Sequence, residues 1–165
     1  MAKAKYQFED FLITVKDENK DFVVNVHQML LKENYKPKLQ VTKSTGFQLS
    51  YSEPKIKTVA GIILIFFVRD DVLMIRIYGK NHEKYPDVLN DLPLEIVNQI
   101  NKAEDCIKFT NPEKCWKGCI GFEFAIKENH YQKCYTQCFQ FEVNMASMPY
   151  LLKLIECESR ARCLA

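Results

Sequence analysis

The chain has 165 residues, of which 47% are hydrophobic and 27% charged, and its net charge is +2. This composition is typical of a globular protein with a hydrophobic core and argues against an intrinsically disordered chain. The longest apolar run, residues 59–68, is shorter than the roughly 20 residues of a membrane helix, and the N-terminal residues lack the apolar core of a secretory signal. We therefore expect a single compact domain over residues 1–165 that works in the cytoplasm without a membrane partner.

The first half of the sequence changes from a helical to a strand period. Two segments with apolar residues at helical spacing are followed by strictly alternating segments around Gly46 and then by an apolar run, as in a central strand. We expect the four strands to form an antiparallel meander. The predicted elements are helices over 6–16 and 20–34 and strands over 38–42, 47–52, 57–68 and 72–78.

The second half returns to helices and then adds two strands and a last helix. Pro86 either interrupts or starts a short helix over residues 81–90, and Pro93 falls in the first turn of the next helix, a position that proline favours. The pattern predicts an α+β fold in which an antiparallel sheet of five or six strands, the meander plus two later strands, carries helices on one face. The expected elements are helices over 81–90 and after 92, strands over 122–126 and 131–143, and a helix after 147.

Cysteine is the side chain with the most distinctive chemistry in this sequence. The chain has seven cysteines against three histidines, an odd total that fits poorly with a complete set of disulfides. Thiolates in a reducing compartment are common zinc ligands. The sequence therefore indicates a four-ligand zinc site, in which His130 can replace one cysteine. Its candidate ligands are Cys106, Cys115, Cys119 and Cys134.

The spacing of the cysteines keeps other interpretations open. If residues 131–143 form one regular strand, Cys134 and Cys138 lie about 13 Å apart and cannot bind the same metal ion. The simplest interpretation is that the cysteines are small, half-apolar residues of the core and the sheet, since free cysteine is among the most buried residue types. A third interpretation is a reactive thiol or a redox pair, since the cations next to Cys115, Cys119 and Cys134 in the sequence would lower a thiol pKa. Those cations are Lys114, Lys117 and Lys133.

Positive charge is concentrated between residues 32 and 57, which contain six lysines and two glutamates. The lysines are typical of a strand edge protected from pairing with other chains. An alternative function is nucleic-acid binding through Lys36, Lys38 and Lys43. Against it, Phe47 and Tyr51 alternate in phase with an apolar residue and therefore belong to the core.

Arg76 interrupts an otherwise apolar strand. Its guanidinium either reaches solvent at a sheet edge or is paired in a pocket, where it could bind a carboxylate or phosphate ligand. The chain contains no phosphate-binding glycine loop, dinucleotide fingerprint, serine nucleophile elbow or metalloprotease spacing. An enzyme is therefore less expected than a binding protein.

Two stretches of the sequence carry a resemblance. One is Thr-Gly-Phe-Gln-Leu-Ser-Tyr at residues 45–51 with Ile-Arg-Ile-Tyr at 75–78, and the other is Asn-Pro-Glu-Lys-Cys at 111–115 with His-Tyr-Gln-Lys-Cys at 130–134. Together they resemble small uncharacterised proteins of anaerobic bacteria. The resemblance covers most of the chain, implies a bacterial cytosolic protein and supplies no catalytic residue.

These observations lead to three functional hypotheses. The first is a small-ligand- or metal-binding module, with Arg76 as a ligand-binding residue or with zinc held by the cysteines. The second is a thiol-dependent enzyme or redox sensor. The third is a nucleic-acid or protein-interaction module that uses the basic strands over residues 36–57.

Overall fold

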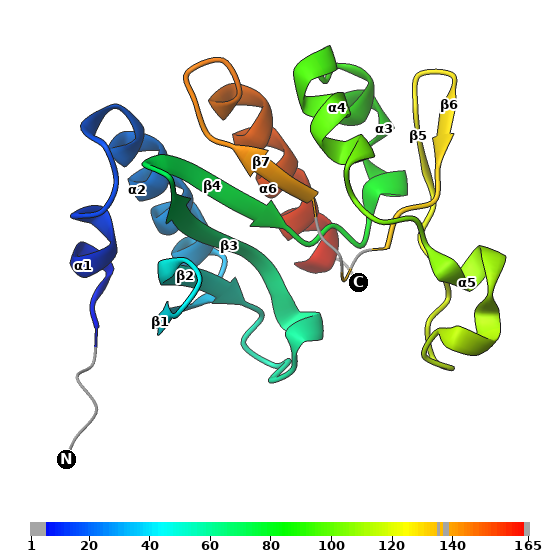
Figure 1. Cartoon of the computed structure of the whole chain (residues 1–165), viewed down its shortest axis with the longest axis horizontal. Helices are drawn as coiled ribbons and strands as arrows, with labels where there is room; N and C mark the ends of the chain where they lie inside the picture. Colours follow the sequence, from blue (N-terminus) through cyan, green and yellow to red (C-terminus); the bar gives the residue numbers. More distant parts are fainter. Residues whose placement is uncertain (1–5, 135, 137–138, 164–165) are drawn as a thin grey trace. The chain divides into compact units, whose positions relative to one another are not determined.

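A computed structural model describes residues 6–134, 136 and 139–163 (Figure 1). Within these residues the larger sheet has five antiparallel strands in the order β1-β2-β3-β4-β7, and a second sheet pairs β5 with β6. The α+β class and the five-stranded antiparallel sheet are thus confirmed. The strands are β1 (Lys36–Thr42), β2 (Gly46–Ser52), β3 (Ile62–Arg69), β4 (Val72–Ile77), β5 (Phe124–Ile126), β6 (Asn129–Tyr131) and β7 (Phe139–Glu142).

Most of the helices begin within a few residues of the predicted positions. Pro86 is the first residue of α3, which is one of the two placements that the sequence left open. None of the described helices is both long and apolar enough to span a bilayer. The helices are α1 (Phe8–Leu12), α2 (Asp17–Lys32), α3 (Pro86–Asn90), α4 (Leu94–Asn101), α5 (Ile107–Thr110) and α6 (Met148–Cys163), with short 3-10 helices η1 (Val59–Gly61), η2 (His82–Lys84) and η3 (Pro112–Lys114).

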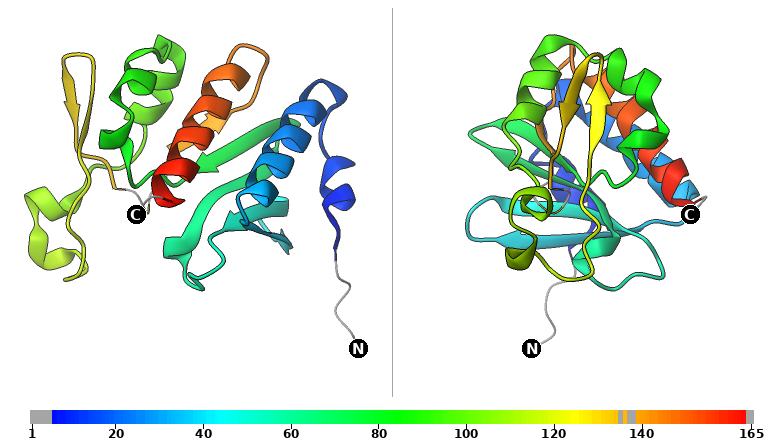
Figure 2. Two further views of the ribbon diagram at one scale, coloured as in Figure 1. Left: turned by 180° about the vertical axis from the view of Figure 1, so that it is seen from behind. Right: turned by 90° about the vertical axis from the view of Figure 1, so that its right-hand side faces the viewer.

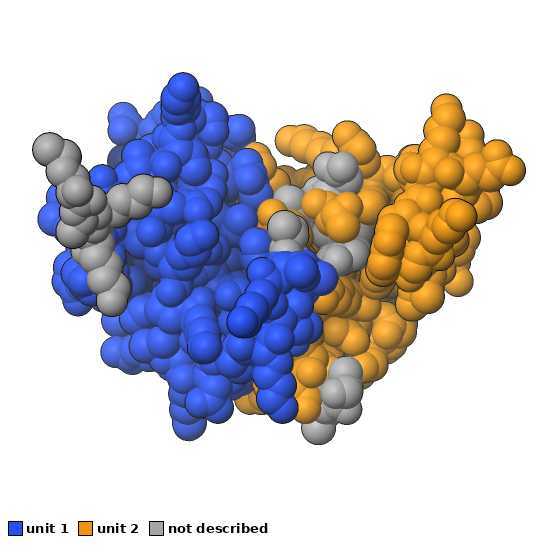
Figure 3. Space-filling view, turned by 90° about the horizontal axis from the view of Figure 1, so that it is seen from below, with its two compact units in different colours: residues 1–76, 142–149 blue, residues 77–141, 150–165 orange. Residues whose placement is uncertain are grey.

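The chain divides into two compact units, which Figure 3 distinguishes by colour. Unit 1 consists of residues 1–76 and 142–149, and unit 2 consists of residues 77–141 and 150–165. The expectation that residues 1–165 act as one domain stays a prediction.

Helix α2 and the sheet strands build the core of unit 1. Leu49 of β2 lies opposite Phe66 of β3, so both side chains point to the same face of the sheet. The rings of Phe11 in α1 and Phe22 in α2 contact Phe66 at centroid distances of 6.3 and 6.1 Å. Tyr51 is fully buried, which confirms that it is a core residue rather than a base-stacking platform.

Local sequence determines how the elements of unit 1 end. Asn34 follows α2 with a φ of 66°, and the next residue donates its N–H back to the Leu30 carbonyl at 2.9 Å, a common helix ending. Asp70 and Asp71 both have positive φ, at 52° and 60°, and join β3 to β4. A two-residue hairpin turn needs this conformation, and Asp tolerates it better than most residues.

In unit 2 the β5–β6 hairpin contacts α3 (Figure 2). The strand predicted over residues 122–126 is therefore present as β5, but it belongs to this hairpin and not to the larger sheet. The strand predicted over 131–143 is wrong in extent: β6 ends at Tyr131 and β7 begins at Phe139. The reason is a different backbone partner, since the Cys106 N–H donates to the Gln132 carbonyl and the Cys134 N–H to the Glu104 carbonyl.

Candidate functional site: a thiol-lined cavity

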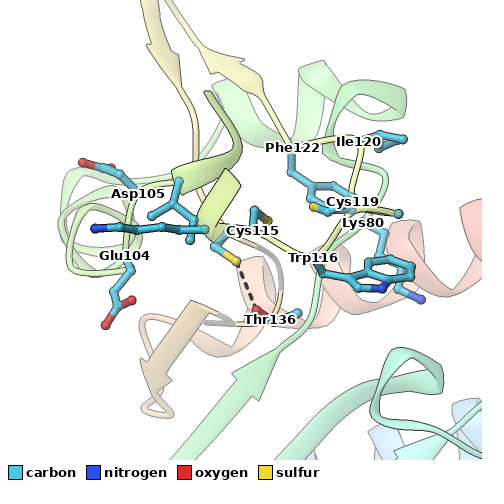
Figure 4. A pocket seen from close by; sticks show the side chains of 13 residues that line it. Lys80, Glu104, Asp105, Cys115, Trp116, Cys119, Ile120, Phe122 and Thr136 are labelled. Atoms are coloured by element: carbon cyan, nitrogen blue, oxygen red, sulfur yellow. Dashed lines mark hydrogen bonds between the residues drawn. The ribbon is translucent and has the colours of Figure 1, made fainter. Parts of the chain in front are cut away.

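A cavity of about 510 Å³ opens in unit 2, beside the loop that follows η3 (Figure 4). Among the described residues, Cys115, Cys119 and Cys134 supply thiols to its wall, and Trp116 and Phe122 supply aromatic rings. Its volume lies in the range of small-molecule pockets. The sequence offered no helical or strand period for residues 105–121, and the structure shows that this aperiodic segment forms most of the wall.

Two successive turns bring Cys115 and Cys119 to the same side of the loop. The Cys115 N–H donates to the Pro112 carbonyl at 3.2 Å, and the Cys119 N–H donates to the Trp116 carbonyl at 3.0 Å. The Gly121 N–H then donates to the Cys119 sulfur at 3.4 Å. Gly121 has a φ of 81°, a conformation that favours glycine, and the loop thereby turns back towards β5.

Cys115 and Cys119 both line the cavity. Partial burial and the neighbouring Cys119 thiol raise the pKa of the Cys115 thiol, and the Trp116 backbone and the charge of Lys108 oppose this shift only in part. The prediction that neighbouring lysines lower this pKa is therefore wrong for Cys115. Although Lys114 is next to Cys115 in the sequence, its charge does not outweigh the effect of burial, which raises the thiol pKa.

Lys133 anchors the segment that carries Cys134. Its ammonium donates to the carbonyl oxygens of Asn101 and Ala103, at 3.2 and 2.8 Å, and pairs with the Asp105 carboxylate at 2.8 Å. The Cys134 sulfur in turn contacts the Thr136 hydroxyl at 3.1 Å (Figure 4). Lys133 thus stabilises the chain around the end of α4.

We expect Lys133→Met to lower the free energy of unfolding by about 1–2 kcal/mol. The methionine fills similar space but leaves the Ala103 carbonyl without this donor, whereas the exposed Asp105 carboxylate is resolvated. Denaturant unfolding of the variant measures the loss. Lys114→Met, which changes an exposed lysine on the cavity rim, serves as the control and should stay within about 0.5 kcal/mol of the parent protein. Equal values for the two variants would contradict the anchoring role.

A buried carboxylate on α6 stabilises the loop that brings Lys80 to the cavity. Glu158 is fully buried. It accepts hydrogen bonds from the backbone N–H groups of Lys80 and Asn81 at 2.9 and 3.2 Å and from the Tyr85 hydroxyl at 2.7 Å. Its carboxylate also pairs with the Arg162 guanidinium at 2.9 Å. The three hydrogen bonds connect α6 to residues more than 70 positions earlier in the chain, whereas the ion pair with Arg162 lies within the helix.

The ionised form of Glu158 is the stable one in this setting. Burial raises the pKa of its carboxyl, but the hydrogen bonds from Lys80 and Tyr85 and the charge of Arg162 outweigh burial, so the pKa is lowered overall. Arg162 also donates to the Tyr78 carbonyl. The cluster therefore has a charge-balanced pair surrounded by donors and acceptors, as a buried ion pair requires.

His82 packs in an aromatic environment next to this cluster. Its ring centroid lies 4.7 Å from that of Phe124 and 4.8 Å from that of Phe139. Burial lowers the pKa of His82 to about 4, so the imidazole is neutral at pH 7. Its ring also occupies the space that a side chain at Gly79 would need, which accounts for glycine at that position.

The structure places the four predicted zinc ligands in two environments. Cys115, Cys119 and Cys134 line the cavity, whereas Cys106 is buried at the start of α5 and is absent from the cavity wall. In the part of the chain that the structure describes, no group of three or more His, Cys, Asp or Glu side chains could hold a metal ion. His130 lies in the β5–β6 hairpin, with its Nε2 3.4 Å from the exposed carboxylate of Glu123. Zinc binding stays a prediction.

Cys138 lies outside the described residues. The predicted separation of Cys134 and Cys138 on one strand therefore stays a prediction.

Arg76 and the basic lysines belong to unit 1. The Arg76 guanidinium lies 4.7 Å from the ring centroid of Phe67, in cation–π geometry. Arg76 is half-buried and does not line the thiol cavity. The side chains of Lys36, Lys38 and Lys43 are exposed, the first two on the edge strand β1.

Unit 1 has a second cavity, of about 350 Å³, beside His27. The His27 Nδ1 lies 2.7 Å from the Tyr51 hydroxyl, and its ring stacks on Phe8 at a centroid distance of 3.7 Å. Burial lowers the pKa of His27, opposed by the charge of Glu9. These ring contacts come from α1 and β2, so they leave no local pattern in the sequence around His27.

Sequence reasoning missed the aromatic residues of the thiol cavity and the carboxylate of Glu158. Trp116, the single tryptophan of the chain, was one available signal, because it lies between two of the cysteines in the sequence. The structure shows that its side chain is 76% exposed at the cavity. Comparisons with protein-family models, curated proteins and solved structures found no match for this chain, so the geometry of the site is the basis for any functional conclusion.

Proposed function

We propose that the chain is a small-ligand-binding module whose site is the thiol-lined cavity of unit 2. The observation that carries this proposal is the wall itself, where thiols, aromatic rings and aliphatic side chains surround about 510 Å³. Cavities of this size and largely apolar lining are the usual sites for small molecules. The expected ligand is a compact apolar molecule with an aromatic or sulfur-seeking group.

The charges on the rim support a ligand without strong net charge. Lys80 and Lys114 line the cavity, and so do Glu104 and Asp105. Because Asp105 is itself paired with Lys133, the rim carries at most a small net positive charge and does not select strongly for one sign of charge. The half-buried ring of Phe122 and the exposed ring of Trp116 offer flat surfaces for an aromatic ligand.

Trp116 makes this proposal directly measurable. Because the chain has a single tryptophan, its emission reports on this cavity alone. We expect the neutral fluorescent probe N-phenyl-1-naphthylamine to quench Trp116 and to gain emission by energy transfer from it. About 0.3 kcal/mol per non-hydrogen atom gives a dissociation constant on the order of 0.1 mM for a probe of this size.

Two variants control the probe experiment. Phe122→Ser should weaken binding, because it removes a ring from the wall. Leu31→Ser changes an exposed apolar residue that lines the cavity of unit 1 instead, and it should leave the titration unchanged. Probe emission that rises without quenching of Trp116, or that ignores Phe122→Ser, would place binding elsewhere and contradict the proposal.

Zinc remains the alternative ligand for the same thiols. Native mass spectrometry of the freshly purified protein, with and without a chelator, tests it separately. One bound zinc that protects Cys115, Cys119 and Cys134 from alkylation would favour the metal-binding form of the module. The probe titration, run on chelator-treated protein, distinguishes the two forms.

A further inference from the structure

The cavity beside His27 is a second candidate site, and all the residues of its wall belong to unit 1. Its volume of about 350 Å³ is at the lower end of the range for small-molecule sites. The wall combines the segment that begins α1 with side chains of α2, β1 and β2. Its aliphatic residues are Leu31, Pro37, Leu39 and Leu49, and its aromatic and polar residues include Phe8, Glu9 and His27.

The hydroxyl of Tyr51 determines which nitrogen of His27 carries the proton. It lies 2.7 Å from the His27 Nδ1, and within the described part of the chain this is the one hydrogen bond of that hydroxyl. Tyr51 is fully buried, and burial raises the pKa of its phenol, so the hydroxyl keeps its proton. Because a buried donor without an acceptor costs free energy, the hydroxyl donates to Nδ1.

The proton of the His27 imidazole is consequently on Nε2. Burial lowers the pKa of His27, and the charge of Glu9 opposes the shift only in part, so the ring is neutral at pH 7. A neutral imidazole has one N–H donor and one acceptor nitrogen, and Tyr51 already occupies the acceptor. None of the described residues accepts a hydrogen bond from Nε2. The ring therefore offers one N–H donor to a ligand.

Two aromatic neighbours hold the ring of His27 in place. Phe8 of α1 stacks on it with an interplanar angle of 10° and a centroid distance of 3.7 Å. The ring of Tyr51 in β2 contacts it edge-on, with the centroids 5.8 Å apart. A donor that is fixed by its neighbours loses little conformational entropy when a ligand binds.

We propose that the cavity of unit 1 binds an uncharged aromatic molecule through one hydrogen-bond acceptor, such as a carbonyl oxygen, which accepts the His27 Nε2–H. The aliphatic side chains of the wall contact the ring of this ligand. The carboxylate of Glu9 in the same wall disfavours an anion. An ammonium ion would meet a donor rather than an acceptor at His27. This inference does not depend on the thiol cavity of unit 2.

The tautomer of His27 is the first measurement. Long-range ¹H–¹⁵N correlation spectra of the labelled full chain at pH 7.5 report the protonation of both ring nitrogens in each of the three histidines. We expect His27 to have a protonated Nε2 and an unprotonated Nδ1. A proton on Nδ1, or averaging between the two tautomers, would overturn the proposed donor.

A pair of ligands of equal size then tests the hydrogen bond in the parent protein. Acetophenone has the carbonyl acceptor, and 2-phenylpropene has a CH₂ group in place of its oxygen. The methyl resonances of Leu31 and Leu39 report binding at this cavity. We expect acetophenone to bind about fivefold more tightly, the usual contribution of one hydrogen bond. Equal affinities, or no shift at either leucine, would overturn the proposal, and so would tighter binding of benzoate or benzylammonium.

Matched histidine variants locate this preference. His27→Phe keeps a ring next to Phe8 but has no N–H, so it should bind the two ligands equally. Adding Tyr51→Phe removes the hydroxyl that His27→Phe leaves unpaired, and this double variant should behave in the same way. His130→Phe is the control and should retain the preference, because His130 is exposed in the β5–β6 hairpin and lines neither cavity. A preference that survives His27→Phe would contradict the role of Nε2.

The two binding sites are read by different signals. Quenching of Trp116 reports the thiol cavity of unit 2, and the leucine methyl groups report the cavity of unit 1. Failure of one proposal is therefore distinguishable from failure of the other.

Discussion

Glu158→Ala is expected to lower the free energy of unfolding by about 3–5 kcal/mol, the cost of leaving a buried partner charge uncompensated. The substitution removes the acceptor for the Lys80 and Asn81 N–H groups and for the Tyr85 hydroxyl, and it leaves the Arg162 guanidinium buried. Denaturant unfolding at pH 7 measures the change. Glu158→Gln, which keeps one acceptor oxygen, gives a milder second measurement if the alanine variant does not fold.

The same helix contains a matched control. Glu156 and Arg160 repeat the i,i+4 spacing of the buried pair, with a contact of 2.8 Å, but their side chains are 39% and 66% exposed. Pairs of this kind contribute about 0.3–0.5 kcal/mol. Glu156→Ala should therefore have little effect, and similar losses for the two alanine variants would show that burial of Glu158 contributes nothing.

Acidification is expected to destabilise the protein by about 2 kcal/mol between pH 7.5 and pH 5, and by about 3 kcal/mol at pH 4, through His82 alone. The pKa of His82 in the folded protein is about 4, below the ordinary value of 6.5. In the window between these values the unfolded chain binds a proton that the folded chain does not. Stability is therefore complete above pH 6.5 and is lost as the pH falls towards 4.

His82→Phe tests the source of this pH dependence, because it keeps an aromatic ring against Phe124 and Phe139 and cannot titrate. The free energy of unfolding of the variant should vary less with pH between 7.5 and 5 than that of the parent protein. Glu158 has a lowered pKa, so its contribution is present above its ordinary value of 4.5 and is lost only below that pH. Measurements above pH 5 therefore separate the two groups. Parallel pH profiles for variant and parent would contradict the role of His82.

Parts of the fold could be predicted from the sequence because they depend on local interactions. The stripe of apolar residues in α2, the proline at the start of α3 and the two aspartates between β3 and β4 each act within a few residues. The continuous apolar run in β3 also indicated a central strand, and its side chains from Ile63 to Phe67 are buried. In each case the determining interaction is local or depends only on how much apolar surface a segment must bury.

The pairing between segments that are distant in the chain could not be predicted from the sequence. Residues 132–134 have strand-like alternation, yet their backbone bonds to residues 104–106, and that choice ended the predicted strand at Tyr131. The cysteine cluster suggested a shared site, but only the folded loop showed that Cys115 and Cys119 line one cavity while Cys106 lies elsewhere in the core. An alternating pattern indicates that a segment can pair as a strand, but it does not indicate which other segment is its partner.

The two glutamate–arginine pairs of α6 show this division most clearly. In the sequence, Glu156 with Arg160 and Glu158 with Arg162 are the same i,i+4 motif two residues apart, and the sequence by itself determines that both pairs can form on a helix. Only the tertiary structure decides that one pair faces water and the other is buried against residues 78–85. The reason is that burial depends on what packs against each side of the helix, and that neighbour comes from a distant part of the chain.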